Sequence, residues 1–151
     1  MLAAGVLVAV VGLGVVGPVG SAVAGAGLTP VGTVTEFSTG ITANSDPDGI
    51  AAGADGNMWF TESRSSKIGR ITPTGKVTEF GTGITANSDP VGIAPGADGN
   101  MWFTQGDSAL IGRITPTGKV TEFSTGITAH SDPYEIAPGA DGNMEPVRSS
   151  V

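Results

Sequence analysis

Residues 57–80 read NMWFTESRSSKIGRITPTGKVTEF, and residues 100–123 read NMWFTQGDSALIGRITPTGKVTEF. Both stretches belong to a unit that returns every 43 residues, beginning at Leu28, Ile71 and Ile114. The first two copies are identical at 32 of 43 positions without a gap. The third copy matches through Met144 and then reads EPVRSSV where the others continue with WFT. The chain is therefore built from copies of one supersecondary unit.

Turn residues divide each unit into four short strands. In the first complete unit we expect strands over 49–54, 57–62, 67–72 and 76–80, separated by an Asp-Gly turn, a polar loop and a Pro-Thr-Gly turn. Four strands in one repeat of this length are typical of a β-propeller blade. Residues 92–123 form a second blade, 32–37 form a lone fourth strand, and 135–140 open a third blade whose other strands are absent. The fold class is therefore all-β, with blades of four antiparallel strands.

Composition agrees with this fold and excludes some classes of function. The chain has 25 glycines and 10 prolines against 14 % charged residues, which favours short strands joined by tight turns. Its formal net charge is -7 and it has no Lys/Arg cluster, so a nucleic-acid partner is not expected. It has no cysteine, and therefore no disulfide framework.

The first 27 residues contain no charged side chain. Their apolar run, followed by Ala22-Val23-Ala24 before Gly25, predicts an export signal and a secreted or cell-envelope protein. No Lys or Arg precedes the run, and an uncleaved membrane anchor is the alternative. We divide the chain into this segment, 1–27, and a partial propeller, 28–151.

The string DGNMWFTESRSSKIGRITPTGKVTEF, preceded by DPDGIA, resembles the repeat of the virginiamycin B lyase family, whose members are seven-bladed propellers. The resemblance covers residues 28–144. It implies a ring of seven blades, of which this chain carries fewer than three, so we expect a truncated or frameshifted gene product. Blade faces left uncovered would favour self-association.

The resemblance also implies an activity. Members of the family are magnesium-dependent lyases that linearise cyclic depsipeptides of the streptogramin B type by elimination across the ring ester, without water. Their active-site blade carries Glu-Pro-His in its first strand and a Glu fourteen residues after the His. The matching residues in the first unit are Asp46-Pro47-Asp48 and Glu62, so the histidine is missing. The same columns hold Asp89, Val91 and Gln105 in the second unit, and Asp132 and Tyr134 in the third, where the last column is lost.

The columns that differ between copies are candidate ligand contacts, because identical positions specify the blade. Asp48 and Glu62 lie nearly symmetrically about the Asp55-Gly56 turn, so hairpin pairing predicts that they meet at its open end, roughly 5 Å apart. We propose Asp48 and Glu62 as catalytic residues. With Asp46 they would offer three carboxylates to Mg²⁺ or Ca²⁺ and leave one as a base. The alternative is that Asp46 caps a turn and the other two are solvated edge residues.

Two further side chains are candidate contacts to a small cyclic peptide substrate. Tyr134 occupies the column of Asp48, and His130 is the single histidine of the chain, for which a solvated loop residue is the alternative. The recurring Trp59 and Trp102 predict packing between blades. The recurring basic residues Arg70, Arg113, Lys76 and Lys119 predict solvated strand edges.

Three functional hypotheses follow. The first is a lyase-like propeller, active only if the missing blades come from a longer product or a neighbouring chain. The second is a non-catalytic exported propeller module that binds a cell-wall or extracellular ligand. The third is a remnant with no stable fold.

Overall fold

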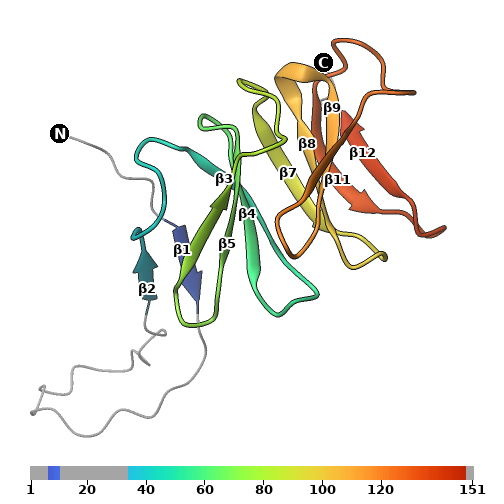
Figure 1. Ribbon diagram of the computed structural model, residues 1–151. Coiled ribbons are helices and arrows are strands. Elements are labelled where there is room, and N and C mark those ends of the chain that lie inside the picture. The colour runs from blue at the N-terminus through green and yellow to red at the C-terminus, as the bar shows by residue number, and fades with distance from the viewer. Residues whose placement is uncertain (1–6, 11–33, 149–151) are drawn as a thin grey trace, which may run out of the picture.

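The computed structural model describes residues 7–10 and 34–148, and their regular structure is almost entirely antiparallel β-sheet (Figure 1). Two sheets have four strands each, joined in sequence order. The first contains β3 (Pro47–Ala52), β4 (Met58–Glu62), β5 (Lys67–Ile71) and β6 (Val77–Phe80). The second contains β7 (Pro90–Pro95), β8 (Met101–Gln105), β9 (Leu110–Ile114) and β10 (Val120–Phe123), with a 3₁₀ turn at Gly106–Ser108.

Two further pairs of strands flank these sheets. The first pair is β1 (Leu7–Val10) with β2 (Val34–Phe37), and the second is β11 (Pro133–Pro138) with β12 (Met144–Arg148). Within the described residues, no helix is long and apolar enough to cross a membrane.

The sequence predicted the two complete blades, but it was wrong about these flanking pairs. The strand expected over 32–37 is not alone, because β1 pairs with it. The remainder of the predicted segment 1–27 lies outside the described residues. The third blade has a second strand, β12, although the motif WFT is lost there.

Pro146 is compatible with β12 because of the direction in which its nitrogen points. The Gly139 N–H donates to Asn143 O at 2.7 Å, so hydrogen-bonded and non-hydrogen-bonded pairs alternate from this turn onward. Ile136 and Pro146 then form a non-hydrogen-bonded pair. The missing N–H therefore lies on the side away from β11 and costs the hairpin no bond.

The repeated Asp-Gly-Asn turn forms in the same way in each copy. In the first blade, Asp55 Oδ1 accepts from the Asn57 N–H at 3.1 Å and from Trp59 Nε1 at 3.1 Å, while Gly56 takes a φ of 76°. The carboxylate thus orders the turn and anchors the tryptophan that follows it. These bonds lower the pKa of Asp55, although burial alone would raise it.

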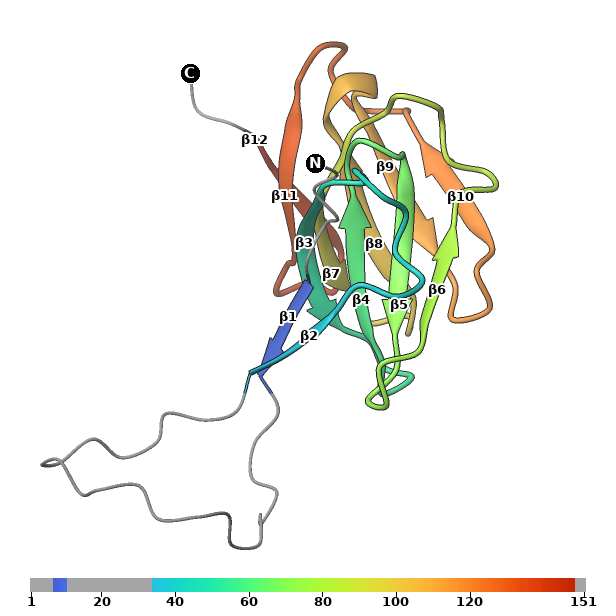
Figure 2. The same ribbon diagram turned by 90° about the vertical axis from the view of Figure 1, so that its left-hand side faces the viewer.

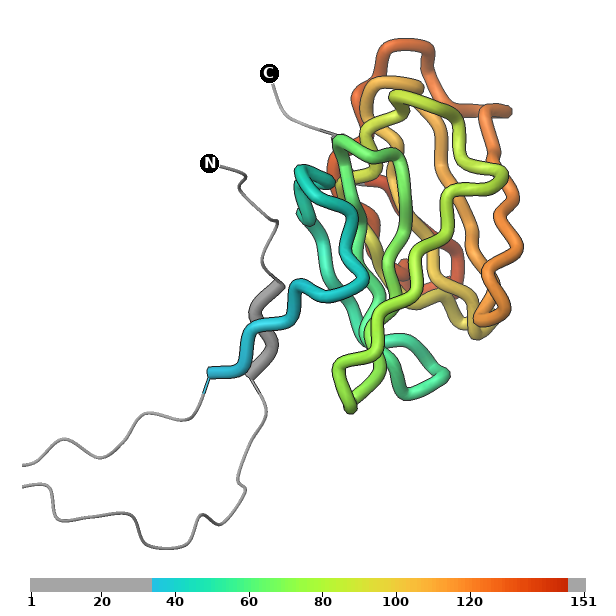
Figure 3. Tube along the Cα trace, turned by 60° about the vertical axis from the view of Figure 1, so that its left-hand side comes forward, coloured from blue at the N-terminus to red at the C-terminus, as the bar shows by residue number. Residues whose placement is uncertain are grey.

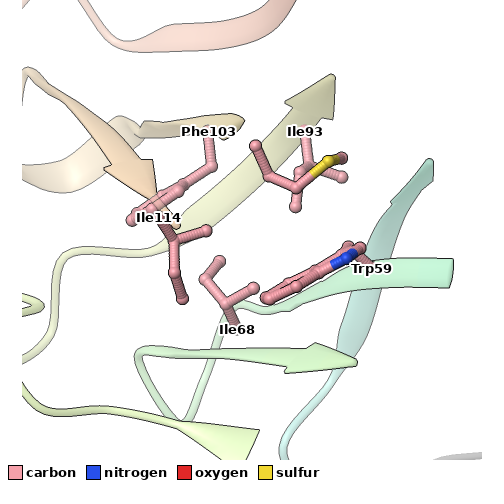
Figure 4. Packing of buried hydrophobic residues seen from close by; sticks show 6 residues of the cluster. Trp59, Ile68, Ile93, Phe103 and Ile114 are labelled. Atoms are coloured by element: carbon pink, nitrogen blue, oxygen red, sulfur yellow. The ribbon is translucent and has the colours of Figure 1, made fainter. Parts of the chain in front are cut away.

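The main core lies between the two complete blades. Trp59 and Ile68 from the first sheet meet Ile93, Phe103 and Ile114 from the second (Figure 4). Met101 belongs to the same cluster. On the other face of the first sheet, the segment between β2 and β3 crosses the blade (Figure 3). Phe37 and Ile41 pack there against Phe60 and Ile71.

The innermost strands of successive blades, β3, β7 and β11, lie next to one another. Figure 2 shows these three strands along one side and the outer strands β6 and β10 along the other. Side chains join neighbours across this row: Thr61 Oγ1 donates to Val91 O at 2.7 Å, and Thr104 Oγ1 donates to Tyr134 O at 3.0 Å. The row positions the candidate site.

Candidate functional site

A cleft of about 260 Å³ runs along the three innermost strands. Each strand contributes the same three consecutive columns of the repeat to its wall. The lining residues are Asp48, Gly49 and Ile50 from β3, Val91, Gly92 and Ile93 from β7, and Tyr134, Glu135 and Ile136 from β11.

A register shift in each strand creates this wall. Pairing with the next strand of the blade is irregular between Pro47 and Ile50, between Pro90 and Ile93, and between Pro133 and Glu135. Residues at such a shift are released from regular ladder pairing, and their side chains are re-aimed. The prolines that open the strands recur in every copy, so the cleft follows from the repeat.

The glycines in the cleft permit close approach of neighbouring strands. A Cβ atom at Gly49 would lie 2.5 Å from Val91 O, and one at Gly92 would lie 2.6 Å from Tyr134 O. The third copy has Glu135 in this column, and Glu135 is exposed. Sequence reasoning missed Glu135, although the replacement of a repeated glycine by a charged residue is a signal that could have found it.

The structure brings together two of the predicted site residues. Asp48 and Tyr134, which share one column of the repeat, both line the cleft. Tyr134 is 51 % exposed and Ile50 is 43 % exposed, so the cleft presents aromatic and aliphatic surface beside carboxylates. This combination suits a ligand with apolar rings and polar groups.

Glu62 lies elsewhere, inside the first blade. Its side chain is fully buried, and its carboxylate accepts from Ser45 Oγ at 3.3 Å and from Ser65 Oγ at 3.3 Å. Burial, together with the neighbouring Glu79 carboxylate, raises the pKa of Glu62 to about 7. The residue opposite Glu62 in the hairpin is Pro47, and Asp48 lies in the register shift beyond it. Glu62 therefore does not line the cleft.

Glu79, whose carboxylate neighbours that of Glu62, is held by a basic side chain. Lys67 Nζ lies 2.7 Å from Glu79 Oε2, and Thr42 Oγ1 donates to the same oxygen at 2.7 Å. The Thr42 N–H also donates to this carboxylate. Burial alone would raise the pKa of Glu79, but these hydrogen bonds outweigh it and lower the pKa. The network fixes the segment after β2 to the first blade.

The second blade keeps the carboxylate of this network, since Glu122 accepts from Thr85 Oγ1 at 2.8 Å, but it replaces the other two charged residues with uncharged ones. Gln105 stands in the column of Glu62, and Leu110 in the column of Lys67. Gln105 is fully buried, and both polar atoms of its amide lack a partner among the described residues. In the third blade, Arg148 pairs with Pro133 as Glu62 pairs with Pro47, so the column predicted to be lost is present.

Asp46 is at the surface rather than beside Glu62. Its side chain is 63 % exposed and forms an ion pair with Arg64 at 3.4 Å. The three carboxylates predicted to share a metal ion are therefore not gathered. In the part of the chain that the structure describes, no group of three or more His, Cys, Asp or Glu side chains could hold a metal ion.

Asp48, which lines the cleft, belongs to a larger group of acidic residues. Burial raises the pKa of Asp89, and the carboxylates of Asp107, Asp48, Asp132 and Asp46 raise it further. These groups thus share one region of negative potential.

His130 lies in an exposed loop and does not line the cleft. Its φ is 57°, close to the values of 60° for Asn44 and 56° for Asn87 in the same column. Asn and His are among the residues that enter this left-handed region most readily, which explains the column without a ligand.

Arg70 and Arg113 are not solvated strand edges, and that prediction was wrong. The Arg70 guanidinium lies 5.4 Å from the centroid of the Trp59 ring, and its Nη1 donates to Pro116 O at 2.7 Å. The Arg113 guanidinium lies 5.5 Å from the Trp102 ring. Each guanidinium group therefore lies over a tryptophan ring in the outer part of its blade, which is the geometry of a cation-π contact.

Comparisons with known proteins agree with this geometry. The model of the virginiamycin B lyase family matches residues 21–146. A comparison with curated protein sequences gave no match.

Solved structures of lyases resemble the chain over most of its length. Virginiamycin B lyase from Staphylococcus aureus, as a selenomethionine derivative, is 32 % identical with a TM-score of 0.69, covering 82 % of this chain and 48 % of that one. A streptogramin B lyase is 31 % identical with a TM-score of 0.67, covering 82 % and 47 %. A catalytically inactive variant of the Staphylococcus aureus enzyme with quinupristin gives 31 % identity and a TM-score of 0.67, covering 80 % and 47 %. The chain spans about half the length of these relatives. The chain belongs to the virginiamycin B lyase family.

Proposed function

We propose that the chain binds a cyclic depsipeptide of the streptogramin B type in the cleft of β3, β7 and β11 and opens its ring by elimination. The observation that carries the proposal is that Asp48 and Tyr134 both line this cleft. Asp48 stands in the column that the family resemblance assigns to the catalytic histidine. The relatives named for these antibiotics support the ligand class.

In this proposal Asp48 is the base. Its carboxylate takes a proton from the carbon next to the one that bears the ester oxygen. The electron pair of that C–H bond forms a C=C bond, and the C–O bond breaks with release of a carboxylate. Tyr134 positions the ring of the ligand against the row of isoleucines. No water is consumed.

Magnesium does not fit the described carboxylates as a three-residue site, because Glu62 is buried inside the blade and Asp46 is paired with Arg64. We therefore assign no step to Mg²⁺. Because none of the proposed residue roles involves a metal ion, we expect that EDTA leaves ligand binding by the 151-residue chain unchanged.

The test uses quinupristin and a neutral streptogramin B antibiotic with the full chain. Liquid chromatography with mass spectrometry separates the two chemistries, since elimination gives a linear product of unchanged mass and hydrolysis adds the mass of one water. We expect a product of unchanged mass, reduced at least about 100-fold in Asp48→Asn because general bases contribute roughly this much. Glu36→Gln, on β2, removes one exposed carboxylate away from the cleft and serves as the matched control. Turnover unaffected by Asp48→Asn would refute this role for Asp48.

A second candidate is a non-catalytic exported binding module. It is favoured by the absence of a histidine from the cleft and by the burial of Glu62 away from it. Saturable depsipeptide binding by calorimetry, with no product in the same sample, would select this candidate. The export proposed with it is checked by sequencing the N-terminus of the protein recovered from culture medium, with Gly25 expected as the first residue.

A further inference from the structure

We infer that an open face on the second blade, formed by Trp102, Arg113 and Phe123, binds residues 28–37 of a second copy of this chain. Two copies therefore join head to tail, with the open face of one copy against this docking segment of the other. The inference goes beyond the proposed function and does not depend on it.

The corresponding face of the first blade shows what such a surface accepts. Trp59 stacks on Phe80 with 5.5 Å between the ring centroids, and the Arg70 guanidinium lies over both rings. A turn of the second blade covers this group, since Arg70 Nη1 donates to Pro116 O at 2.7 Å. A Cβ atom at Gly118 would lie within 3 Å of the Phe80 ring. The glycine thus lets the turn lie directly against the aromatic side chain.

The strand after this turn completes the contact. Val120, on β10, packs against the core cluster that contains Trp59 and Ile68. Trp59 is 1 % exposed as a result. A proline carbonyl, a glycine and a valine of one repeat therefore close the aromatic face of the repeat before it.

The second blade carries the equivalent group without this cover. Trp102 stacks on Phe123 with 5.4 Å between the ring centroids, and Arg113 lies over both rings. Yet Trp102 is half-buried and Phe123 is 37 % exposed. Among the described residues, Arg113 forms an ion pair with Asp98 at 3.8 Å but has no counterpart of the carbonyl that Arg70 binds. Apolar rings and a hydrogen-bond donor are thus left for another partner.

The open face also adjoins a hollow of about 200 Å³. Its lining includes Asp98, Trp102 and Met144. Met101, in the column of Met144, is instead 3 % exposed in the core between the two complete blades. The surface is therefore recessed as well as apolar, which suits a protruding turn.

The docking segment has the sequence that such a face accepts. Residues 28–37 read LTPVGTVTEF and residues 114–123 read ITPTGKVTEF, so seven of ten positions are identical. Pro30 and Gly32 repeat the proline and glycine of the covering turn, and Val34 repeats the valine that follows it. The segment can therefore offer the same carbonyl, the same close approach and the same aliphatic side chain.

The described part of the docking segment is itself uncovered. Val34, on β2, is 58 % exposed, although Val120 in the same column packs in the core. Phe37 packs on the first blade of its own copy, on the face opposite the second blade. The first blade thus lies between the docking segment and the open face, so the two surfaces meet only between copies. Such a contact is heterologous, because each copy uses two different surfaces.

The experiment disables each surface separately and measures association of the full chain by sedimentation velocity. Val34→Asp disables the docking segment, and Phe123→Asp disables the open face. We expect each variant alone to associate at least about tenfold more weakly than the parent, because a charge enters an apolar contact. Ala54→Asp adds the same charge at an exposed turn of the first blade and should associate like the parent.

Mixing the two defective variants tests the head-to-tail arrangement. The Val34→Asp copy keeps its open face and the Phe123→Asp copy keeps its docking segment, so one intact contact forms between them. We expect an equimolar mixture to give a 1:1 dimer with an affinity within about threefold of a parent contact, since the two sites are independent. A contact between two open faces would not be restored by mixing.

Three outcomes would overturn the inference. They are a monomeric parent at every concentration, parent-like association of Val34→Asp, and a mixture that stays as weakly associated as its components. Circular dichroism checks that each variant is folded, and Val34→Ser and Phe123→Ser replace any aspartate variant that is not.

Discussion

Glu62 shows how far a single residue can differ from its prediction. Its place at the end of WFTE suggested a carboxylate at the rim, and the structure gives it a buried site between Ser45, Ser65 and Glu79. The repeat could not predict this, because these partners come from other elements that fold over the same face. By contrast, Asp48 and Tyr134 could be predicted as cleft residues, since their column differs between copies and lies on the innermost strand.

The raised pKa of Glu62 predicts a pH-dependent stability. The pKa rises from 4.5 in the unfolded chain to about 7, so the folded state binds an extra proton between these values. The stability linked to Glu62 is therefore fully present below pH 4.5 and is lost as pH rises through 7, by roughly 3 kcal/mol at most.

Glu62→Gln tests this at the residue scale. Glutamine resembles the protonated carboxyl and already occupies this column as Gln105, so the variant should unfold at similar urea concentrations at pH 5 and at pH 8. The parent chain should be less stable at pH 8, and Glu36→Gln should behave like the parent. A parent chain whose stability does not fall between these pH values would contradict the assignment.

At the scale of the element, strands β5 and β9 depend on glycines beneath a phenylalanine ring. A Cβ atom at Gly69 would lie 2.1 Å from Phe60 Cζ, and one at Gly112 would lie 2.1 Å from Phe103 Cζ. The ring of each Phe therefore occupies the place of a missing side chain. The strands themselves were predictable from turn residues, whereas β12 was missed because the motif WFT is replaced there by a different sequence.

Gly112→Ala should destabilise the second blade by about 1–3 kcal/mol, because Phe103 is fully buried and cannot move aside without strain. Thermal unfolding followed by circular dichroism measures the loss. The control is Gly81→Ala, where the new Cβ would meet only the flexible side chain of Lys67, with Cγ at 3.4 Å and Cε at 4.0 Å, which are ordinary contacts. Equal melting temperatures for the two variants would show that the ring contact is unimportant.

At the scale of the whole molecule, the two complete blades do not cover their tryptophans equally. Trp59 is 1 % exposed beneath the second blade, whereas Trp102 is half-buried and Phe123 is 37 % exposed. The repeat predicted that blade faces would carry such side chains, and the described residues leave part of one of these faces open. Self-association through this open blade face remains our proposal.

Sedimentation velocity over a range of protein concentrations tests that proposal. We expect association that weakens about tenfold in Phe123→Ser, since a buried phenylalanine contributes about 1.5–3 kcal/mol. The matched control is Met58→Ser, because Met58 lies on the first blade and is exposed to a similar extent, at 36 %. A single monomeric species at every concentration would refute self-association.

The register shift shared by β3, β7 and β11 has a consequence for how this architecture acquires new specificities. It frees the same column in each innermost strand from ladder pairing, and that column carries Asp48, Val91 and Tyr134. The residues that hold blades together, such as Phe60 and Phe103, belong to other columns. Recognition can thus evolve one blade at a time, by exchange of a single side chain, while the interfaces that keep the blades folded stay constant.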